Sequence, residues 1–219
     1  MSSLSDSSAD ARLSGFYRVL ASFYKEKAAV DGHLMLGRVA EELSRVASSH
    51  LGRPQQCLLP VVRLLGRLEQ NSGSLLGRFV ELAGELPWLQ NPSYLNVFSR
   101  ELQNDYGYIR LLGPTDEAIA YSGDVAVSLG VWRAGLCYPP HLHPAEEVYH
   151  VLAGQVGIAG ADDVYRELFP GVGEDVAHNE SGIPHALRFG PPDADPELAS
   201  PCVLLWSWTG RSDECSVLL

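Results

Sequence analysis

Residues 135–154 read GLCYPPHLHPAEEVYHVLAG, and their spacing constrains this 219-residue chain more than any other stretch. Alternate side chains of an extended backbone point to the same face. Four polar side chains share one parity here: His141, His143, Glu147 and Tyr149. Inside a barrel such groups are costly unless they are satisfied, and two imidazoles with a carboxylate suit a divalent transition metal. The stretch therefore favours an interior metal site over a surface strand with scattered histidines.

The second half of the chain has the pattern of short strands separated by turns. Runs rich in β-branched and aromatic residues predict strands over 106–112, 125–132, 147–152 and 203–209. Gly and Pro recur between these runs, which is typical of a β-barrel or double-sheet jelly roll. We therefore predict a β-barrel domain over residues 113–219.

The first half has helical periodicity instead. Apolar residues recur at helical spacing over 11–27, 34–46, 60–68 and 74–86, and a short fifth helix is predicted over 92–102. We predict a helical region over residues 1–112 that packs on the barrel, an α+β fold overall. This region could cover the barrel of its own chain or of a second copy, so a homodimer stays open.

Composition and charge exclude several classes of partner. The formal net charge is −11, and residues 114–219 carry −12 of it, while residues 1–113 carry +1. An acidic chain does not favour a nucleic-acid partner or an anionic membrane surface. No run of about 18 apolar residues occurs and the N-terminus lacks a signal-peptide pattern, so we expect a cytoplasmic protein. The four cysteines are far apart and are expected to be free thiols: Cys57, Cys137, Cys202 and Cys215.

The quoted stretch resembles the first cupin motif from Gly135 to Gly154: Gly, five residues, His-x-His, Glu and a closing Gly. A second cupin motif normally reads Pro-x-Gly-x-x-His-x-x-x-Asn. Here Gly182 and His185 keep that pattern, whereas Glu180 replaces the first Pro and Phe189 the Asn. The resemblance implies a single-cupin barrel over about half of the chain, with His185 as the fourth metal ligand. His178 competes for this role but lacks the preceding Gly and Pro.

The wider pattern resembles the cupin-type dimethylsulfoniopropionate (DMSP) lyases, including larger members with an N-terminal helical region. It joins Tyr138, the histidine and glutamate cluster, Tyr149 and the later Pro184-His185. The resemblance implies β-elimination of a small zwitterionic substrate, DMSP, to dimethyl sulfide and acrylate. It implies that His141, His143, Glu147 and His185 hold one divalent metal ion. It also implies that Tyr149 is the base and that Tyr138 assists in substrate binding or proton handling.

The sulfonium group of such a substrate requires a site for a cation. Trp206 and Trp208 share one face of the predicted strand 203–209, and aromatic faces attract onium groups. Core packing explains the same two residues equally well. Trp132 and Tyr165 are weaker candidates, Arg188 is a candidate contact for carboxylates, and Glu146 is expected to support a ligand or face solvent.

Two other functions remain open from the residues alone. A cupin iron dioxygenase acting on a small thiol or acid needs a similar metal site. A cupin binding or sensor module needs no catalytic tyrosine. The donor set suits iron, manganese, cobalt, nickel or zinc and does not select among them.

Overall fold

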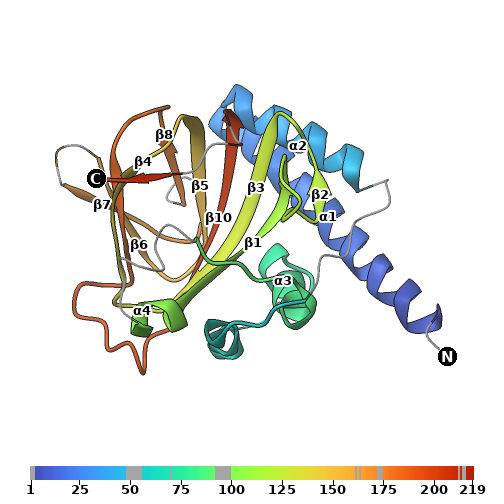
Figure 1. The fold of residues 1–219 in the computed structure, drawn as a ribbon, viewed down its shortest axis with the longest axis horizontal. Coiled ribbons are helices and arrows are strands. Elements are labelled where there is room, and N and C mark those ends of the chain that lie inside the picture. The colour runs from blue at the N-terminus through green and yellow to red at the C-terminus, as the bar shows by residue number, and fades with distance from the viewer. Residues whose placement is uncertain are drawn as a thin grey trace.

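The computed structural model describes residues 3–47, 56–69, 71–91, 100–160, 162, 164–171, 175–211, 213 and 216–219. Two β-sheets face one another, and helices lie against the outer side of one of them (Figure 1). Within these ranges, no helix combines the length and the apolar character needed to cross a bilayer. The predicted α+β architecture, a helical region followed by a cupin-type barrel, is confirmed.

The helical region comprises four α-helices and two short 3₁₀ helices in the described residues. They are α1 (Ser3–Asp31), α2 (Leu34–Val46), η1 (Pro60–Arg67), α3 (Leu75–Leu82), η2 (Ala83–Glu85) and α4 (Arg100–Asp105). Gly32 separates α1 from α2 with a φ of +69°, a conformation that glycine adopts at little cost. Ser74 caps α3, because its hydroxyl accepts a hydrogen bond from the Gly77 amide at 3.0 Å. The first four predicted helices correspond to α1, α2, η1 and α3, while residues 92–99 of the fifth lie outside the described residues.

The first sheet has six strands in the order β2-β1-β3-β10-β5-β8. They are β1 (Tyr106–Gly113), β2 (Ala120–Tyr121), β3 (Val125–Trp132), β5 (Ala145–Ala153), β8 (Val176–Asn179) and β10 (Cys202–Gly210). All four predicted strands are confirmed and lie in this sheet. The sheet begins at Tyr106, so almost all of β1 lies in the region 1–112 that was predicted to be helical. The division into domains 1–112 and 113–219 stays a prediction.

The second sheet has five shorter strands in the order β11-β4-β9-β6-β7. They are β4 (Cys137–Leu142), β6 (Val156–Ala159), β7 (Tyr165–Leu168), β9 (His185–Phe189) and β11 (Val217–Leu218). Residues of the quoted stretch therefore divide between the sheets, with β4 in the second and β5 in the first. His141, His143, Glu147 and Tyr149 keep the same parity across the turn between β4 and β5. Their side chains therefore point into the barrel from two walls.

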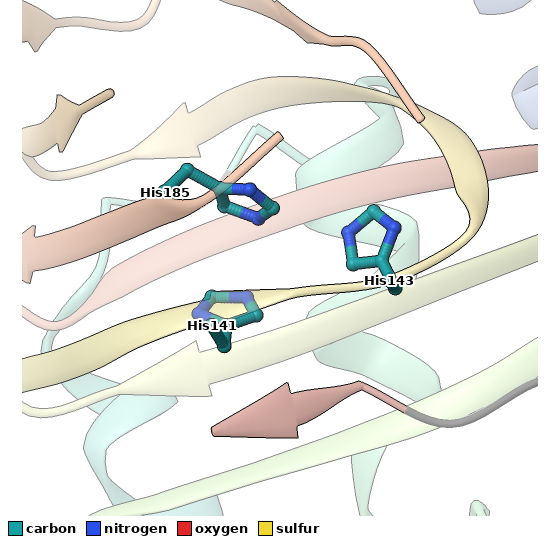
Figure 2. Close-up of side chains that lie close together, drawn as sticks. All are labelled: His141, His143 and His185. Carbon is teal, nitrogen blue, oxygen red and sulfur yellow. The ribbon is translucent and has the colours of Figure 1, made fainter. Parts of the chain in front are cut away.

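The barrel interior is apolar at one end and polar at the other. Buried interior side chains include Tyr106, Trp132, Val156, Phe189 and Leu204. At the polar end, His141 projects from β4 and His185 from β9, while His143 follows β4 (Figure 2). This end of the barrel holds the metal-ligand candidates that the sequence predicted.

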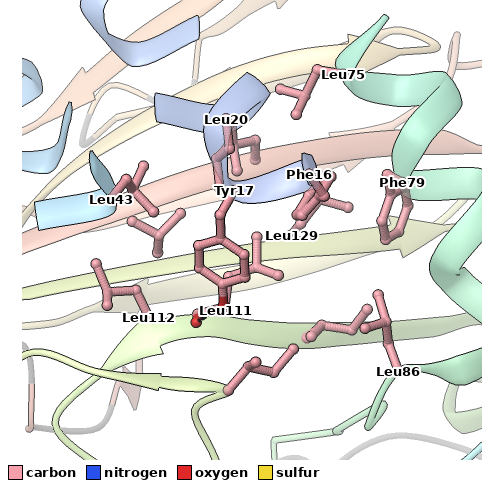
Figure 3. Close-up of a cluster of buried hydrophobic side chains, with 14 of the residues drawn as sticks. Phe16, Tyr17, Leu20, Leu43, Leu75, Phe79, Leu86, Leu111, Leu112 and Leu129 are labelled. Atoms are coloured by element: carbon pink, nitrogen blue, oxygen red, sulfur yellow. Dashed lines mark hydrogen bonds between the residues drawn. The ribbon is translucent and has the colours of Figure 1, made fainter. Parts of the chain in front are cut away.

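The opposite face of the six-stranded sheet carries a separate apolar core under the helices. Figure 3 shows Phe16 and Tyr17 of α1 and Phe79 of α3 packed over the strand residues Leu111 and Leu129. The Tyr17 hydroxyl donates a hydrogen bond to the Leu111 carbonyl. Burying such a side chain contributes about 1.5–3 kcal/mol, so these contacts hold the helices firmly on the sheet. The helical region covers the barrel of its own chain.

Candidate metal centre

Three histidines converge at the polar end of the barrel. His141 and His185 are direct partners in the register of β4 and β9, and His143 lies just beyond β4. One ring nitrogen of each lies within 4.8 Å of the others (Figure 2). All three side chains are buried, with exposures of 3%, 1% and 3%. The cross-strand pairing and the turn together bring three imidazoles to one point.

Backbone carbonyls orient these imidazoles. Nδ1 of His141 lies 3.0 Å from the Pro139 carbonyl oxygen, and Nδ1 of His185 lies 3.1 Å from that of Ile183. Nδ1 of His143 lies 2.9 Å from the Ala145 carbonyl oxygen. A carbonyl can only accept, so each Nδ1 carries the proton and each Nε2 is left with a lone pair. This is the tautomer that binds a metal through Nε2.

Glu147 lies among these nitrogens. Its Oε2 is 3.0 Å from His143 Nε2 and 3.2 Å from His185 Nε2. Asn179 donates to the same oxygen at 3.0 Å, and the Trp208 indole N–H donates to Oε1 at 2.6 Å. The carboxylate is 1% exposed and is held at both oxygens.

The pKa values of the cluster follow from burial and mutual attraction. Burial, together with the nearby His185, lowers the pKa of His141 to about 4. Burial opposes the charge on His143, but the contact with Glu147, the attraction of its charge and the Ala145 carbonyl together outweigh burial and raise the pKa of His143. Burial would raise the pKa of Glu147, yet its contacts with the His143 and His185 rings and their electrostatic attraction hold that pKa well below its usual range. Glu147 is therefore an anion beside three imidazoles near neutral pH.

The donor set fits a divalent metal. His185 Nε2 is buried and, among the described residues, makes no hydrogen bond, although it faces the Glu147 carboxylate. A lone pair directed at a carboxylate is unfavourable unless a proton or a cation lies between them. Three imidazole nitrogens and one carboxylate oxygen would satisfy such a cation.

A pocket of about 200 Å³ opens beside this cluster. Its wall includes His141 and Glu147, so a small ligand in the pocket would lie against the metal site. Seven of the fifteen other lining residues are aromatic, and their rings come from five strands: Tyr106, Tyr108, Trp132, Tyr138, Tyr149, Trp206 and Trp208.

Both predicted tyrosines line this pocket. Tyr149 is 4% exposed, and its ring centroid lies 6.2 Å from that of His185. The Tyr138 ring lies 5.1 Å from the His141 ring and 6.4 Å from the Tyr106 ring. The two tyrosine rings thus lie beside the histidine cluster, Tyr149 on β5 and Tyr138 on β4.

The two predicted tryptophans also line the pocket but differ in their contacts. Trp206 packs among aromatic rings, with centroids 5.7 Å from Tyr108 and 5.8 Å from Trp132. Trp208 lies over His143, with centroids 4.6 Å apart, besides donating to Glu147. Trp208 therefore contacts the histidine and glutamate cluster directly, whereas the Trp206 ring lines the cavity among other aromatic rings.

The other sequence-based candidates lie outside the histidine and glutamate cluster. His178 and Glu146 are hydrogen-bonded to each other at 2.7 Å, apart from the buried histidines. Arg188 pairs with Glu167 and stacks over the Tyr165 ring, outside the pocket lining. Trp132 lines the pocket but also stacks on Phe189 at 4.6 Å. The structure therefore groups His185, and not His178, with His141 and His143.

Three of the four cysteines lie in the described residues. Cys57, Cys137 and Cys202 are free, and Cys215 lies outside the described residues. Burial raises the pKa of Cys202 to about 11, so this thiol stays protonated.

Several residues of the pocket and the cluster were not predicted from the sequence. Tyr106 and Tyr108 alternate on a strand that was predicted, so their shared parity was a usable signal. Arg110 continues the same parity and also lines the pocket. Asn179 left no such signal, because its contact with Glu147 depends on the pairing of β5 with β8.

These features define the class of protein: a cupin-type barrel with an interior three-histidine and glutamate cluster. The family model for dimethylsulfoniopropionate lyases matches residues 37–198. The chain belongs to the DMSP lyase family.

Known relatives agree with this assignment. The chain is 47% identical over 97 residues to the dimethylsulfoniopropionate lyase DddQ of Ruegeria pomeroyi, a match spanning 44% of this chain and 43% of that protein. The crystal structure of DddQ from the same organism superposes with a TM-score of 0.67 and 23% identity, covering 93% of this chain and 95% of that one. A structure from a study of the DMSP lyases RdDddP and RnDddQII gives a TM-score of 0.71 and 20% identity, covering 96% and 99%. The solved structures thus share the fold along nearly the whole chain.

Proposed function

We propose that this protein is a metal-dependent lyase that cleaves DMSP by β-elimination to dimethyl sulfide and acrylate. The observation that carries the proposal is one pocket in which Tyr149 and Tyr138 face the buried histidine and glutamate cluster. Membership of the DMSP lyase family supports the same reaction.

His141, His143, Glu147 and His185 would hold one divalent transition metal through three Nε2 atoms and a carboxylate oxygen. The bound ion would act as a Lewis acid toward the substrate carboxylate and would stabilise the negative charge that develops there as the α-proton is removed. Trp208 and Asn179 would keep Glu147 in place through their hydrogen bonds. The three backbone carbonyls would keep each ring in the binding tautomer.

Tyr149 would abstract the α-proton at its phenolate oxygen. A free tyrosine has a pKa near 10, and a neighbouring cation favours the phenolate. The electron pair of the broken C–H bond forms the acrylate double bond while the C–S bond breaks, and sulfur leaves with its electrons as neutral dimethyl sulfide. Tyr138, which lies on β4, would bind the substrate or take part in proton transfer.

The aromatic wall would receive the sulfonium group. Trp206 is the best placed residue, since its ring lines the cavity beside Tyr108 and Trp132. A cation over such a ring gains about 0.5–2 kcal/mol.

The test is headspace detection of dimethyl sulfide from metal-loaded protein incubated with DMSP. We expect release from the natural sequence and a loss of at least about 100-fold in Tyr149→Phe, which removes the base but not a ligand. Tyr165→Phe is the matched control, because Tyr165 stacks under Arg188 outside the pocket lining and its variant should retain activity.

The same assay separates the competing functions. Full activity in Tyr149→Phe would refute the role of Tyr149 as base. Oxygen uptake that depends on an added thiol or acid, without dimethyl sulfide, would indicate a dioxygenase. Binding of DMSP without turnover would indicate a sensor module.

A further inference from the structure

A second group of metal-binding side chains lies outside the barrel. His33, Glu146 and His178 each offer one ligand atom, and the three atoms lie within 4.8 Å of one another. We propose that these residues form a second binding site for a divalent metal of the zinc class, which joins the helical region to the edge of the barrel. This proposal is independent of the lyase reaction.

The backbone presents Glu146 and His178 on the outer face of the sheet. Glu146 precedes Glu147 on β5, so when Glu147 points into the barrel its neighbour points out. His178 lies on β8, the edge strand, opposite Val148, whose side chain belongs to the outer core. Glu146 and His178 are therefore diagonal neighbours, and His178 Nε2 lies 2.7 Å from Glu146 Oε1.

His33 reaches this face from the connection between α1 and α2. It follows Gly32, whose φ of +69° ends α1, and it occupies the N-cap position of α2. The His33 side chain makes no capping hydrogen bond to α2, so its ring is not engaged with the helix terminus. Instead, the ring lies 4.3 Å from that of His178, centroid to centroid, at an angle of 57°.

The donor chemistry selects the class of ligand. Two imidazoles and one carboxylate are the donor types of zinc sites, with bonds of about 2.0–2.2 Å. Donors on such an ion are separated by roughly 3.5 Å, so small rotations of these side chains would complete the shell. His33 and Glu146 are half-buried and His178 is exposed, so a water molecule can take a fourth position.

Occupation of this site would connect three elements of the fold. The helical connection, β5 and β8 are brought together only in the folded chain, so an ion bound there stabilises the folded state. Glu146 also neighbours Glu147 along β5, which places the outer site directly behind the wall of the inner one.

The test is a count of bound metal on the holoprotein after dialysis against Zn²⁺. We expect two metal ions per chain in the natural sequence and one in His33→Gln, Glu146→Gln and His178→Gln. Exposed side chains outside the cluster serve as controls, and Arg38→Gln on α2 and Glu81→Gln on α3 should keep two.

A second pair of variants distinguishes zinc at the outer site from metal at the buried histidine cluster. His141→Ala should keep one zinc, and the double variant His141→Ala, His178→Gln should keep none. Zinc at about 100 times its Kd should raise the melting temperature of His141→Ala by about 5 °C or more and leave the double variant unchanged. Equal zinc uptake and equal melting in His178→Gln and the natural sequence would overturn the proposal, as would zinc uptake by the natural sequence at the buried centre alone.

Discussion

Trp206 and Trp208 lie on the same strand and line the same cavity, yet their contacts indicate different roles. Trp206 offers a ring face framed by Tyr108 and Trp132, whereas the N–H of Trp208 is bonded to the Glu147 carboxylate. The difference is testable one residue at a time.

Replacing Trp206 with alanine should weaken substrate binding. Loss of a cation–π contact of about 0.5–2 kcal/mol corresponds to a rise of roughly 2- to 30-fold in the KM for DMSP. The measurement is steady-state dimethyl sulfide release, with metal content and melting temperature as controls. An unchanged KM in a folded, metal-loaded Trp206→Ala variant would refute the proposal that Trp206 binds the sulfonium group.

Replacing Trp208 with phenylalanine should instead weaken metal binding. The ring over His143 is kept, but Glu147 Oε1 loses its donor at 2.6 Å. Hydrogen bonds to metal ligands of this kind are worth about 10–100-fold in affinity, which competition with a chelator measures. Trp206→Phe is the matched control and should leave metal affinity unchanged; an equal loss in both variants would contradict the assignment.

Helix α1 meets the barrel through a buried polar group as well as through apolar contacts. His150 of β5 is fully buried, with ring centroids 5.2 Å from Phe23 and 5.7 Å from Tyr24. Lys27 of α1 pairs with Asp175 at 2.6 Å, and Asp175 Oδ2 lies 3.7 Å from His150 Nδ1. Burial lowers the pKa of His150 despite the attraction of Asp175.

This contact makes the packing of α1 sensitive to acid. The unfolded chain binds a proton on His150 near pH 6.5, whereas the folded chain keeps the ring neutral to lower pH. The unfolded state therefore binds more protons, and stability falls as the pH drops below about 6.5. The Asp175 carboxylate, whose pKa is lowered below 3.8 by His150 and Lys27 against the opposing effect of burial, adds a further loss at more acid pH.

Denaturant unfolding at several pH values measures this effect. Between pH 6.5 and 5.5 we expect His150 to account for a loss of about 1 kcal/mol in the natural sequence. His150→Phe, which can still pack against Phe23 and Tyr24, should show a shallower dependence by that amount. The same slope in both proteins would show that His150 does not couple acid to the stability of this interface.

At the scale of the whole molecule, the barrel interior gathers buried polar groups that a metal ion would bind together. Three imidazoles and a carboxylate are buried within a few ångströms of one another, and such groups oppose folding unless they are compensated. Metal removal should therefore lower stability as well as activity.

Thermal melting with and without a chelator tests this expectation. The His178→Gln background is suited to it, because the outer cluster is then incomplete. We expect the melting temperature to fall by about 5 °C or more on chelation, with no fall once His141→Ala is added. A chelator-independent melting temperature in a protein shown to carry metal would contradict a stabilising role for the ion.

The sequence was most informative where the determining physics is local. Alternation along extended backbone predicted that His141, His143, Glu147 and Tyr149 share a face, and the Gly and Pro before His185 distinguished it from His178. Helical and strand periods predicted four of the six strands of the first sheet and the main helices, because one face of each is buried. The strands of the second sheet are short, and β4 contains two prolines, so their sequences show little periodicity.

Contacts between distant residues depended on the pairing of strands and the packing of layers. Only the sheet order brings Trp208 and Asn179 to Glu147, and only the α1–α2 connection brings His33 to His178. The corner between β4 and β5 places ligands from one continuous stretch on opposite walls of the barrel. Residue type and parity are local properties that the chain carries along its length, whereas which side chains meet across the barrel is set by burial and hydrogen bonding of the whole fold.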